Sequence, residues 1–241
     1  MKIAVISDIH GNLEALEKVL QDAGRSGADK IICLGDCIGY GPDSNRVVEK
    51  IMAGNIPAVT GNHELVLHNR IHLNWFNSLA RISLEKIIPT LSAEVKNFLR
   101  GLPHSLTVND ARFVHGCPLQ SIKTYLFLAS DYRIRRALDK MKEKICFVGH
   151  THDLVLISYD GRNVLRSPLR AEQTPVEGGR SYIVNVGSVG QPRDGTNTAK
   201  YVIWDTERKR IVLRRIEYDI ARVVEKIKAA GLPEVHGRRL W

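Results

Sequence analysis

Five short apolar runs, each followed at once by polar residues, set the pattern of this chain. They cover residues 2–7, 30–34, 58–60, 112–114 and 145–148. Short apolar runs bounded by turn residues predict buried strands. After the first run, apolar residues recur at helical spacing at Leu13, Leu16, Val19 and Leu20, and a second helix is expected over residues 43–52. The first part of the chain is therefore predicted to be β-α-β-α-β with parallel strands and right-handed crossovers.

The second half of the chain is richer in antiparallel strand signals. We expect a hairpin at residues 105–114, a helix over 130–143, strands at 154–159, 182–186, 201–205 and 210–216, and a loop from 160 to about 179. A last helix begins after Asp219 and ends near residue 231, and the tail to Trp241 is predicted to be loose. Because one sheet of so many strands would be wide, the pattern favours a mixed α/β (α+β) fold of two packed sheets with helices outside.

Residues 65–101 differ from the rest because they are helical in pattern and carry no strand signal. We interpret them as a helical insertion within a single domain that spans residues 1–241. Apolar residues such as Trp75, Phe76, Leu79 and Ile82 anchor it. The segment either packs against the sheet or forms one wall of a site at the strand ends.

Composition narrows the class of protein. The chain has 241 residues, of which 44% are hydrophobic, enough for a substantial core. No apolar run is long enough to span a membrane, and the apolar start is too short for a signal peptide, so we expect a cytoplasmic protein with no membrane partner. The four cysteines form no CxxC pair, which favours buried free thiols over a disulfide framework.

The formal net charge of +9 would attract anions, including nucleic acid. The basic residues fall in short clusters without interleaved aromatic residues of the kind that stack bases. We therefore favour solvated helix and hairpin faces over a nucleic-acid surface. A nuclease stays open as an alternative, and it would require substrate affinity that falls steeply with salt.

Residues whose side chains commonly bind metal ions follow the apolar runs. Because the carboxyl ends of parallel strands meet at one edge of a sheet, we expect these side chains to lie together. Histidine and carboxylate without cysteine suit zinc, iron, manganese or nickel better than calcium. There are too many ligands for one tetrahedral ion, so two ions sharing a carboxylate fit better, an arrangement suited to displacement at phosphorus. The set is Asp8, His10, Asp36, Asn62, His63, His115, His150 and His152.

In order along the chain, these residues resemble the motif blocks of the calcineurin-like metallophosphoesterases. The resemblance spans roughly residues 1–205 and rests on five ordered blocks. A later segment, residues 185–193, is similar to the Asn-Pro-Gly-Ser block of compact bacterial and archaeal members, with Val186 in place of proline. The five blocks are Asp8-x-His10, Gly35-Asp36, Gly61-Asn62-His63-Glu64, Val114-His115-Gly116 and Gly149-His150-Thr151-His152.

The resemblance implies a four-layer αββα sandwich and two divalent metal ions. One ion would take Asp8, His10, Asp36 and His152, and the other would take Asp36, Asn62, His115 and His150. Asp36 would bridge the two ions, and a hydroxide held between them would attack phosphorus in line. His63 would protonate the leaving oxygen.

Two departures from the phosphoprotein phosphatases of this family bear on the substrate. Gly39 stands where those enzymes have the aspartate that orients the catalytic histidine, and Tyr40 stands where they have a phosphate-binding arginine. Tyr40 either lines the substrate pocket or belongs to a helix-entry turn. Arg193 either binds a substrate phosphate or is a surface residue in a Gly/Pro-rich loop.

The expected function is metal-dependent hydrolysis of a phosphoester, with a small soluble phosphodiester or nucleotide as substrate. The alternatives within this chemistry are a phosphomonoesterase or protein phosphatase and a dinucleoside polyphosphate hydrolase. The alternative from another class is a metal-stabilised scaffold protein with weak or no catalysis. The ligand types leave manganese, iron, zinc and nickel open, and the pattern is silent on oligomeric state.

Overall fold

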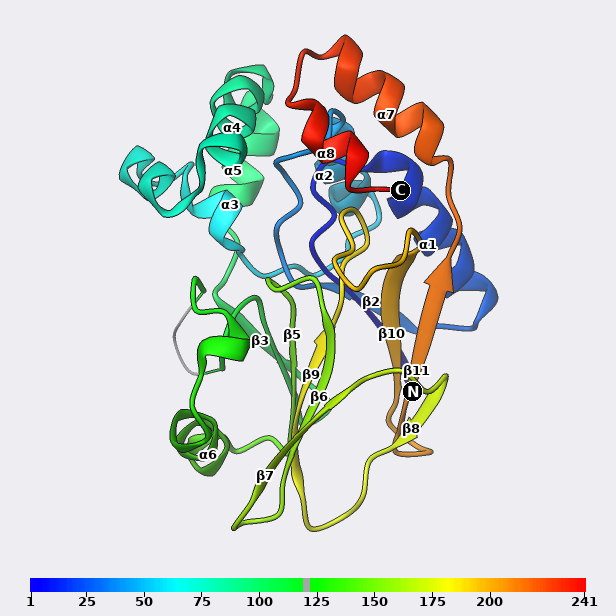
Figure 1. Ribbon diagram of the computed structural model, residues 1–241. Helices are drawn as coiled ribbons and strands as arrows, with labels where there is room; N and C mark the ends of the chain where they lie inside the picture. The colour runs from blue at the N-terminus through cyan, green and yellow to red at the C-terminus, as the bar shows by residue number, and fades with distance from the viewer. Residues whose placement is uncertain (119–121) are drawn as a thin grey trace.

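The computed structural model describes residues 1–118 and 122–241, and these residues form four layers, with two mixed sheets face to face between helices (Figure 1). The predicted mixed α/β fold of two packed sheets flanked by helices is confirmed. Within the described residues, the first sheet has the strand order β2-β1-β10-β11-β8. Its strands are β1 (Lys2–Ile6), β2 (Lys30–Cys33), β8 (Gln173–Pro175), β10 (Ala199–Asp205) and β11 (Arg210–Ile216).

The second sheet has the strand order β3-β4-β5-β9-β6-β7. Strands β4, β5 and β9 are parallel to one another, as are β1 and β2 in the first sheet, and the remaining pairs are antiparallel. The strands of the second sheet are β3 (Ser105–Val108), β4 (Ala111–Val114), β5 (Ile145–Val148), β6 (Leu154–Tyr159), β7 (Val164–Pro168) and β9 (Ser181–Val186).

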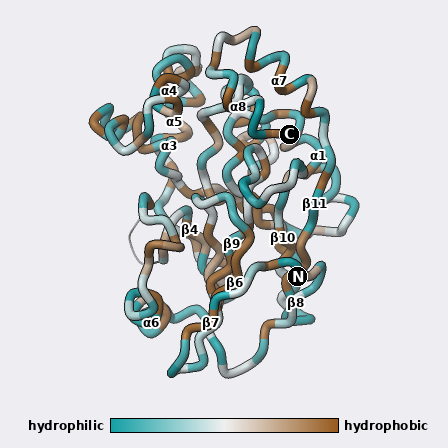
Figure 2. Tube along the Cα trace, in the orientation of Figure 1, coloured by the Kyte–Doolittle hydropathy of each residue, from teal (hydrophilic) through white to brown (hydrophobic). Residues whose placement is uncertain are grey.

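Three buried clusters hold the layers together. One lies between the sheets, one between the first sheet and α1 (Leu13–Arg25), α2 (Ser44–Ala53) and α7 (Ile220–Ala229), and one between the second sheet and α6 (Asp131–Lys140). In β1, Ile3 and Val5 face the other sheet while Ala4 and Ile6 face the helices. Both faces of a central strand are therefore buried, which explains continuous apolar runs in place of alternation. Figure 2 shows these hydrophobic stretches in the strands at the centre.

Residues 62–100 form the helices α3 (Asn62–Leu65), α4 (Ser78–Thr90) and α5 (Ala93–Arg100) and the short 3₁₀ helix η1 (Arg70–Trp75). These helices lie at one end of the sheets, beyond the strand ends (Figure 1). Buried residues of α4 and α5, such as Leu84 and Leu99, join the cluster that covers the first sheet. The predicted helical character of residues 65–101 is confirmed.

Three local predictions were wrong. The predicted loop at residues 160–179 contains β7 and β8, and the predicted loose tail contains α8 (Glu234–Arg238), with Leu240 buried after it. The predicted strand at residues 58–60 is reduced to one bridge between Ala58 and Cys33 because the chain turns into α3 directly afterwards. Strand β7 lies at the edge of its sheet with Leu165 60% exposed, so its pattern lacks the continuous apolar run of a central strand.

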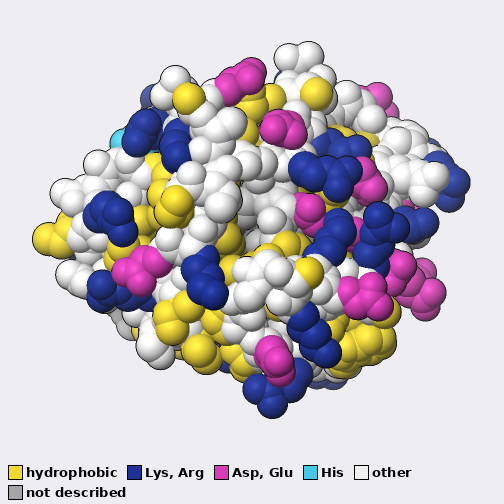
Figure 3. All heavy atoms as spheres, turned by 90° about the horizontal axis from the view of Figure 1, so that it is seen from above, with side chains coloured by type: hydrophobic (Ala, Val, Ile, Leu, Met, Phe, Trp, Pro, Cys, Tyr) yellow, Lys and Arg dark blue, Asp and Glu magenta, His cyan; other side chains and the backbone are white. Residues whose placement is uncertain are grey.

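The basic residues are spread over the surface and many are paired. Arg214 binds Asp22 at 2.7 Å, and Lys226 binds both Glu14 and Asp43. On the face seen from above in Figure 3, Lys and Arg side chains lie in separate groups with Asp and Glu among them. Among the described residues, no helix is long and apolar enough to cross a membrane. The four cysteines are free, as predicted, with Cys117 only half-buried.

Candidate active site

The polar residues predicted to form a site come from loops at the carboxyl ends of the strands. Asp8 and His10 follow β1, and Asp36 follows β2. His115 follows β4, while His150 and His152 follow β5. Asn62 and His63 open α3, after the short bridged segment. The structure brings all eight side chains together where these loops of the two sheets meet.

The backbone at this site is held in an uncommon conformation. Among the described residues, ten that are not glycine have positive φ, and six of these are at the site. Positive φ is sterically unfavourable for residues with a Cβ, and it clusters where function requires a defined direction for a side chain. The six residues are Asp8, His10, Asp36, Tyr40, His150 and His152.

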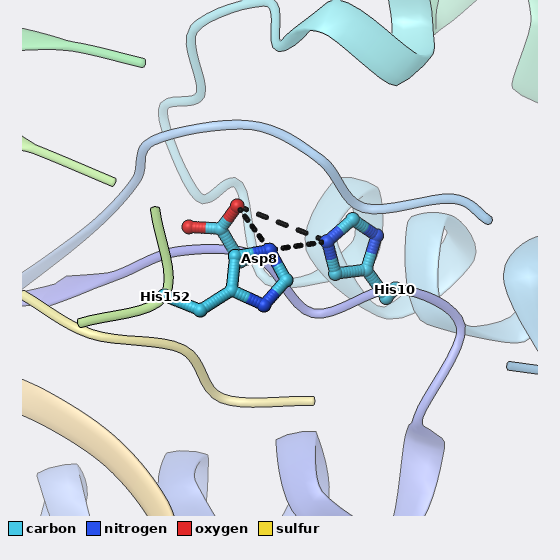
Figure 4. A group of neighbouring side chains, drawn as sticks. All are labelled: Asp8, His10 and His152. Atoms are coloured by element: carbon cyan, nitrogen blue, oxygen red, sulfur yellow. Dashed lines mark hydrogen bonds and ion pairs between the residues drawn. The ribbon is translucent and has the colours of Figure 1, made fainter. Parts of the chain in front are cut away.

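Asp8, His10 and His152 form one group of potential metal ligands (Figure 4). Nε2 of His10 lies 3.1 Å from Nε2 of His152, and Oδ1 of Asp8 lies 3.3 Å from the His152 nitrogen and 3.8 Å from the His10 nitrogen. Figure 4 shows the two rings and the carboxylate converging on one point, Asp8 and His10 from the loop after β1 and His152 from the loop after β5.

Asp36 is at the centre of two further groups, one with His115 and His150 and one with His10 and His63. Its Oδ2 atom lies 3.4 Å from Nε2 of His115 and 3.8 Å from Nε2 of both His10 and His63. Asn62 joins this set, because its Oδ1 atom lies 3.0 Å from the same His115 nitrogen. Asp36 therefore lies within reach of histidines from both of the predicted ligand sets.

Each predicted histidine ligand is oriented by a backbone carbonyl. The Nδ1 atoms of His10, His115 and His152 donate to Ile38 O at 3.1 Å, Leu34 O at 2.8 Å and Gln191 O at 2.5 Å. The imidazole ring of His150 forms a hydrogen bond with the backbone of Lys123. Because a carbonyl only accepts, Nδ1 carries the proton, and the Nε2 lone pairs point into the site. Second-shell bonds of this kind orient histidines that bind metals.

The facing lone pairs fit a cation. Nε2 of His10 and Nε2 of His152 are both acceptors when the rings are neutral, and so are Asp8 Oδ1 and Asn62 Oδ1. Among the described residues, Asp8 Oδ1 and His150 Nε2 have no hydrogen-bond partner although they are buried. Unpaired buried acceptors are costly, and a divalent ion would satisfy them.

Burial sets the protonation of the site. It lowers the pKa of His10 well below its usual value and that of His63 and His150 to about 4, which favours neutral rings. Burial also opposes a charge on His115, but the Asp36 carboxylate beside it raises the pKa of His115 to about 10. A metal ion at His115 would displace that proton.

A cleft opens onto these groups, and Asp36, Asn62, His63, His150 and His152 line it. Both predicted substrate contacts, Tyr40 and Arg193, line it. The helical segment at residues 65–101 supplies one wall of this cleft, which is one of the two arrangements expected from the sequence. Residues that the sequence pattern missed also line the cleft, and within the described residues they are Trp75, Phe76, Asn77, Ala80, Lys123 and Tyr125.

Glu64 is a further residue whose role was not recognised from the sequence. Its carboxylate is fully buried and accepts hydrogen bonds from the backbone N–H groups of Asp36 at 2.8 Å, Cys37 at 2.9 Å, Ile38 at 3.3 Å and Gly61 at 2.9 Å. Burial raises the pKa of Glu64 to about 7, whereas these amides favour the carboxylate. Glutamate as the third residue of a helix, after Gly61, was the signal that could have identified it.

Glu64→Gln should destabilise the metal-free protein by about 3 kcal/mol, because a glutamine NH₂ would face amide donors that now meet a carboxylate oxygen. Chemical denaturation measures the change. Glu85→Gln, in an exposed pair with Arg81, is the matched control and should shift stability by less than about 0.5 kcal/mol. An equally small shift for Glu64→Gln would show that the four hydrogen bonds contribute little.

The fold, together with the clustered aspartate and histidine side chains, is that of a metallophosphoesterase. The chain belongs to the calcineurin-like phosphoesterase superfamily, whose domain model matches residues 1–209. It is 39% identical over 246 residues to an uncharacterized protein of Methanocaldococcus jannaschii, covering 99% of this chain and 97% of that protein.

Two further relatives carry more informative names. A metallophosphoesterase structure from Sphaerobacter thermophilus has a TM-score of 0.85 and 39% identity, covering 100% of this chain and 98% of that one. A stretch of 90 residues is 34% identical to phosphodiesterase YfcE of Escherichia coli, covering 31% of this chain and 49% of YfcE. The resemblance seen in the sequence motifs is thus confirmed at the level of family and fold.

Proposed function

We propose that this protein is a hydrolase of phosphate esters that works with two divalent metal ions. Asp8, His10, Asp36 and His152 would hold one ion, and Asp36, Asn62, His115 and His150 would hold the other. The observation that carries the proposal is the convergence of Nε2 lone pairs, fixed by Nδ1 bonds to carbonyls, around two buried carboxylates. Bound ions of this kind lower the pKa of a water molecule and neutralise charge on phosphoryl oxygens.

The side chains of this protein would then bind the ester and move the proton. His63 is beside the proposed bridging carboxylate and is not needed to complete either ligand set, so it would donate a proton to the leaving oxygen. Burial lowers the pKa of His63 to about 4, so the negative charge of a bound ester would have to favour the protonated ring. Arg193 and Tyr40 would contact the oxygens of the phosphate from the cleft wall. Burial of His63 and the ligands excludes water and strengthens these interactions.

The preferred substrate in this proposal is a small phosphodiester. Tyr40 is uncharged where phosphoprotein phosphatases have an arginine, so the cleft offers less positive charge than a dianionic monoester would favour. The partial identity to a protein named as a phosphodiesterase agrees with this choice.

The test compares two esters on protein stripped of metal and reloaded with manganese, iron, zinc or nickel. We expect metal-dependent hydrolysis of bis(p-nitrophenyl) phosphate at least about tenfold faster than that of p-nitrophenyl phosphate. The opposite preference would keep the hydrolase and contradict the diester. If two bound ions give no rate on either ester or on a panel of nucleotides, the protein would instead be a metal-stabilised scaffold.

A further inference from the structure

His63 lacks the partner that a catalytic histidine ordinarily has. A proton-transferring histidine is usually oriented by a second group on its other ring nitrogen. Here the Nδ1 atom of His63 is buried and has no hydrogen-bond partner among the described residues. The His63 side chain is 3% exposed, so solvent does not supply the missing orientation either.

Position 39 explains why no carboxylate fills this role. Gly39 has φ +95°, and a Cβ built there would overlap the Nδ1 and Cε1 atoms of His63. Any side chain at position 39 would therefore displace the His63 ring from its present place. The backbone of Gly39 lies directly against the atom that an aspartate would otherwise bind.

Rings surround His63 in place of a carboxylate. Its centroid lies 4.7 Å from that of Phe76 at 81°, 5.0 Å from Tyr40 at 63° and 4.6 Å from His10 at 61°. These distances and steep angles are those of favourable edge-to-face pairs. His10 and Tyr40 belong to loops at the ends of the first sheet, whereas Phe76 comes from the helical segment.

Phe76 is itself firmly anchored. It caps η1, with its N–H donating to Leu73 O at 3.2 Å, and the next residue, Asn77, caps α4 by accepting from Ala80 N at 3.0 Å. The Phe76 side chain packs against the buried cluster that covers the first sheet. The ring is therefore fixed on one side by the core and meets His63 on the other.

We propose that Phe76 is a positioning residue that holds the His63 imidazole in one orientation by ring packing, in place of the missing carboxylate. The catalytic part of this inference rests on the proposed function, because His63 is taken there as the proton donor. The helical segment thus contributes directly to the geometry of proton transfer, besides forming a wall of the cleft. A ring held by packing alone should become mobile when the packing partner is removed.

The first test follows the His63 ring and does not depend on activity. In protein with isotope-labelled histidine, the His63 signals are identified by their loss in His63→Gln. Wild type should give one sharp set, and Phe76→Leu should broaden it through exchange between ring orientations. Phe98→Leu is the matched control, because Phe98 is also half-buried against the same cluster but forms no ring pair with His63 among the described residues. Phe76→Tyr, which keeps the ring, should restore the sharp set.

The second test compares leaving groups on the metal-loaded protein. Phe76→Leu should lower kcat on diphenyl phosphate about tenfold more than on bis(p-nitrophenyl) phosphate, because only the poorer leaving group needs the proton. Phe98→Leu should leave this ratio unchanged. A sharp His63 signal in Phe76→Leu, shifted only by loss of the Phe76 ring current, would overturn the proposal. A wild type that hydrolyses neither diester would contradict the diester preference of the proposed function, while the ring signals would still decide the role of Phe76.

Discussion

Asp36→Asn is expected to abolish metal-dependent hydrolysis, lowering kcat by at least about a thousandfold. The structure indicates how an asparagine would sit. Oδ1 of Asp36 accepts the backbone N–H of His63 at 2.9 Å, so the asparagine oxygen would keep this bond. Its NH₂ group would then replace Oδ2, the atom that faces His10, His63 and His115. An uncharged NH₂ donor would thus stand where both proposed ligand sets would require an anionic acceptor.

Metal-dependent stabilisation supplies a second measurement for this variant. An ion at 100 times its Kd should stabilise wild type by about 2.7 kcal/mol, and this shift should be lost in Asp36→Asn. Asp205→Asn is the matched control, because Asp205 is also 2% exposed but pairs with Arg208 and Arg210 at the end of β10. It should cost stability while leaving turnover and metal stabilisation intact. Full metal stabilisation in Asp36→Asn would contradict a bridging role.

The strand-end residues could be predicted because their signal is local. A buried central strand needs a continuous apolar run, and β1 and β5 supply one with both faces covered. Parallel strands place their carboxyl ends at one edge of each sheet, and because the two sheets pack with these edges together, Asp8 of the first sheet meets His150 of the second across 142 positions of sequence. Their contact, His150 N–H to Asp8 Oδ2 at 2.9 Å, follows from topology and not from residue spacing.

The rest of the site depends on contacts that leave no local pattern. Ile38, Leu34 and Gln191 orient three histidines through carbonyl groups, which any residue type could provide. Phe76 packs against the core and also lines the cleft, and its apolar side chain fits either place, so the sequence did not single it out. The end of the chain gave no signal for α8, because that helix is short and is held by tertiary contacts such as His236 with Ser83 at 2.8 Å.

Because Nδ1 of His63 has no hydrogen-bond partner among the described residues, substitution of His63 is the most informative about catalysis. His63→Gln is expected to lower kcat by about 10²–10⁴ on an ester with a poor leaving group, and by much less on p-nitrophenyl esters. Metal content should stay at the wild-type level, since both proposed ligand sets are complete without His63. Turnover and bound metal are measured on the same preparation, with His104→Gln, at an exposed position before β3, as the control.

Measuring both quantities matters because distance alone does not separate the two roles open to His63. Its Nε2 atom lies 3.8 Å from Asp36 Oδ2, the same distance as Nε2 of His10, and His63 falls in one group of potential ligands. Loss of metal in parallel with turnover would make His63 a ligand and require another proton donor. Loss of turnover alone, graded by the leaving group, is the result that a proton donor requires, because a ligand that fails to hold its ion slows every ester alike.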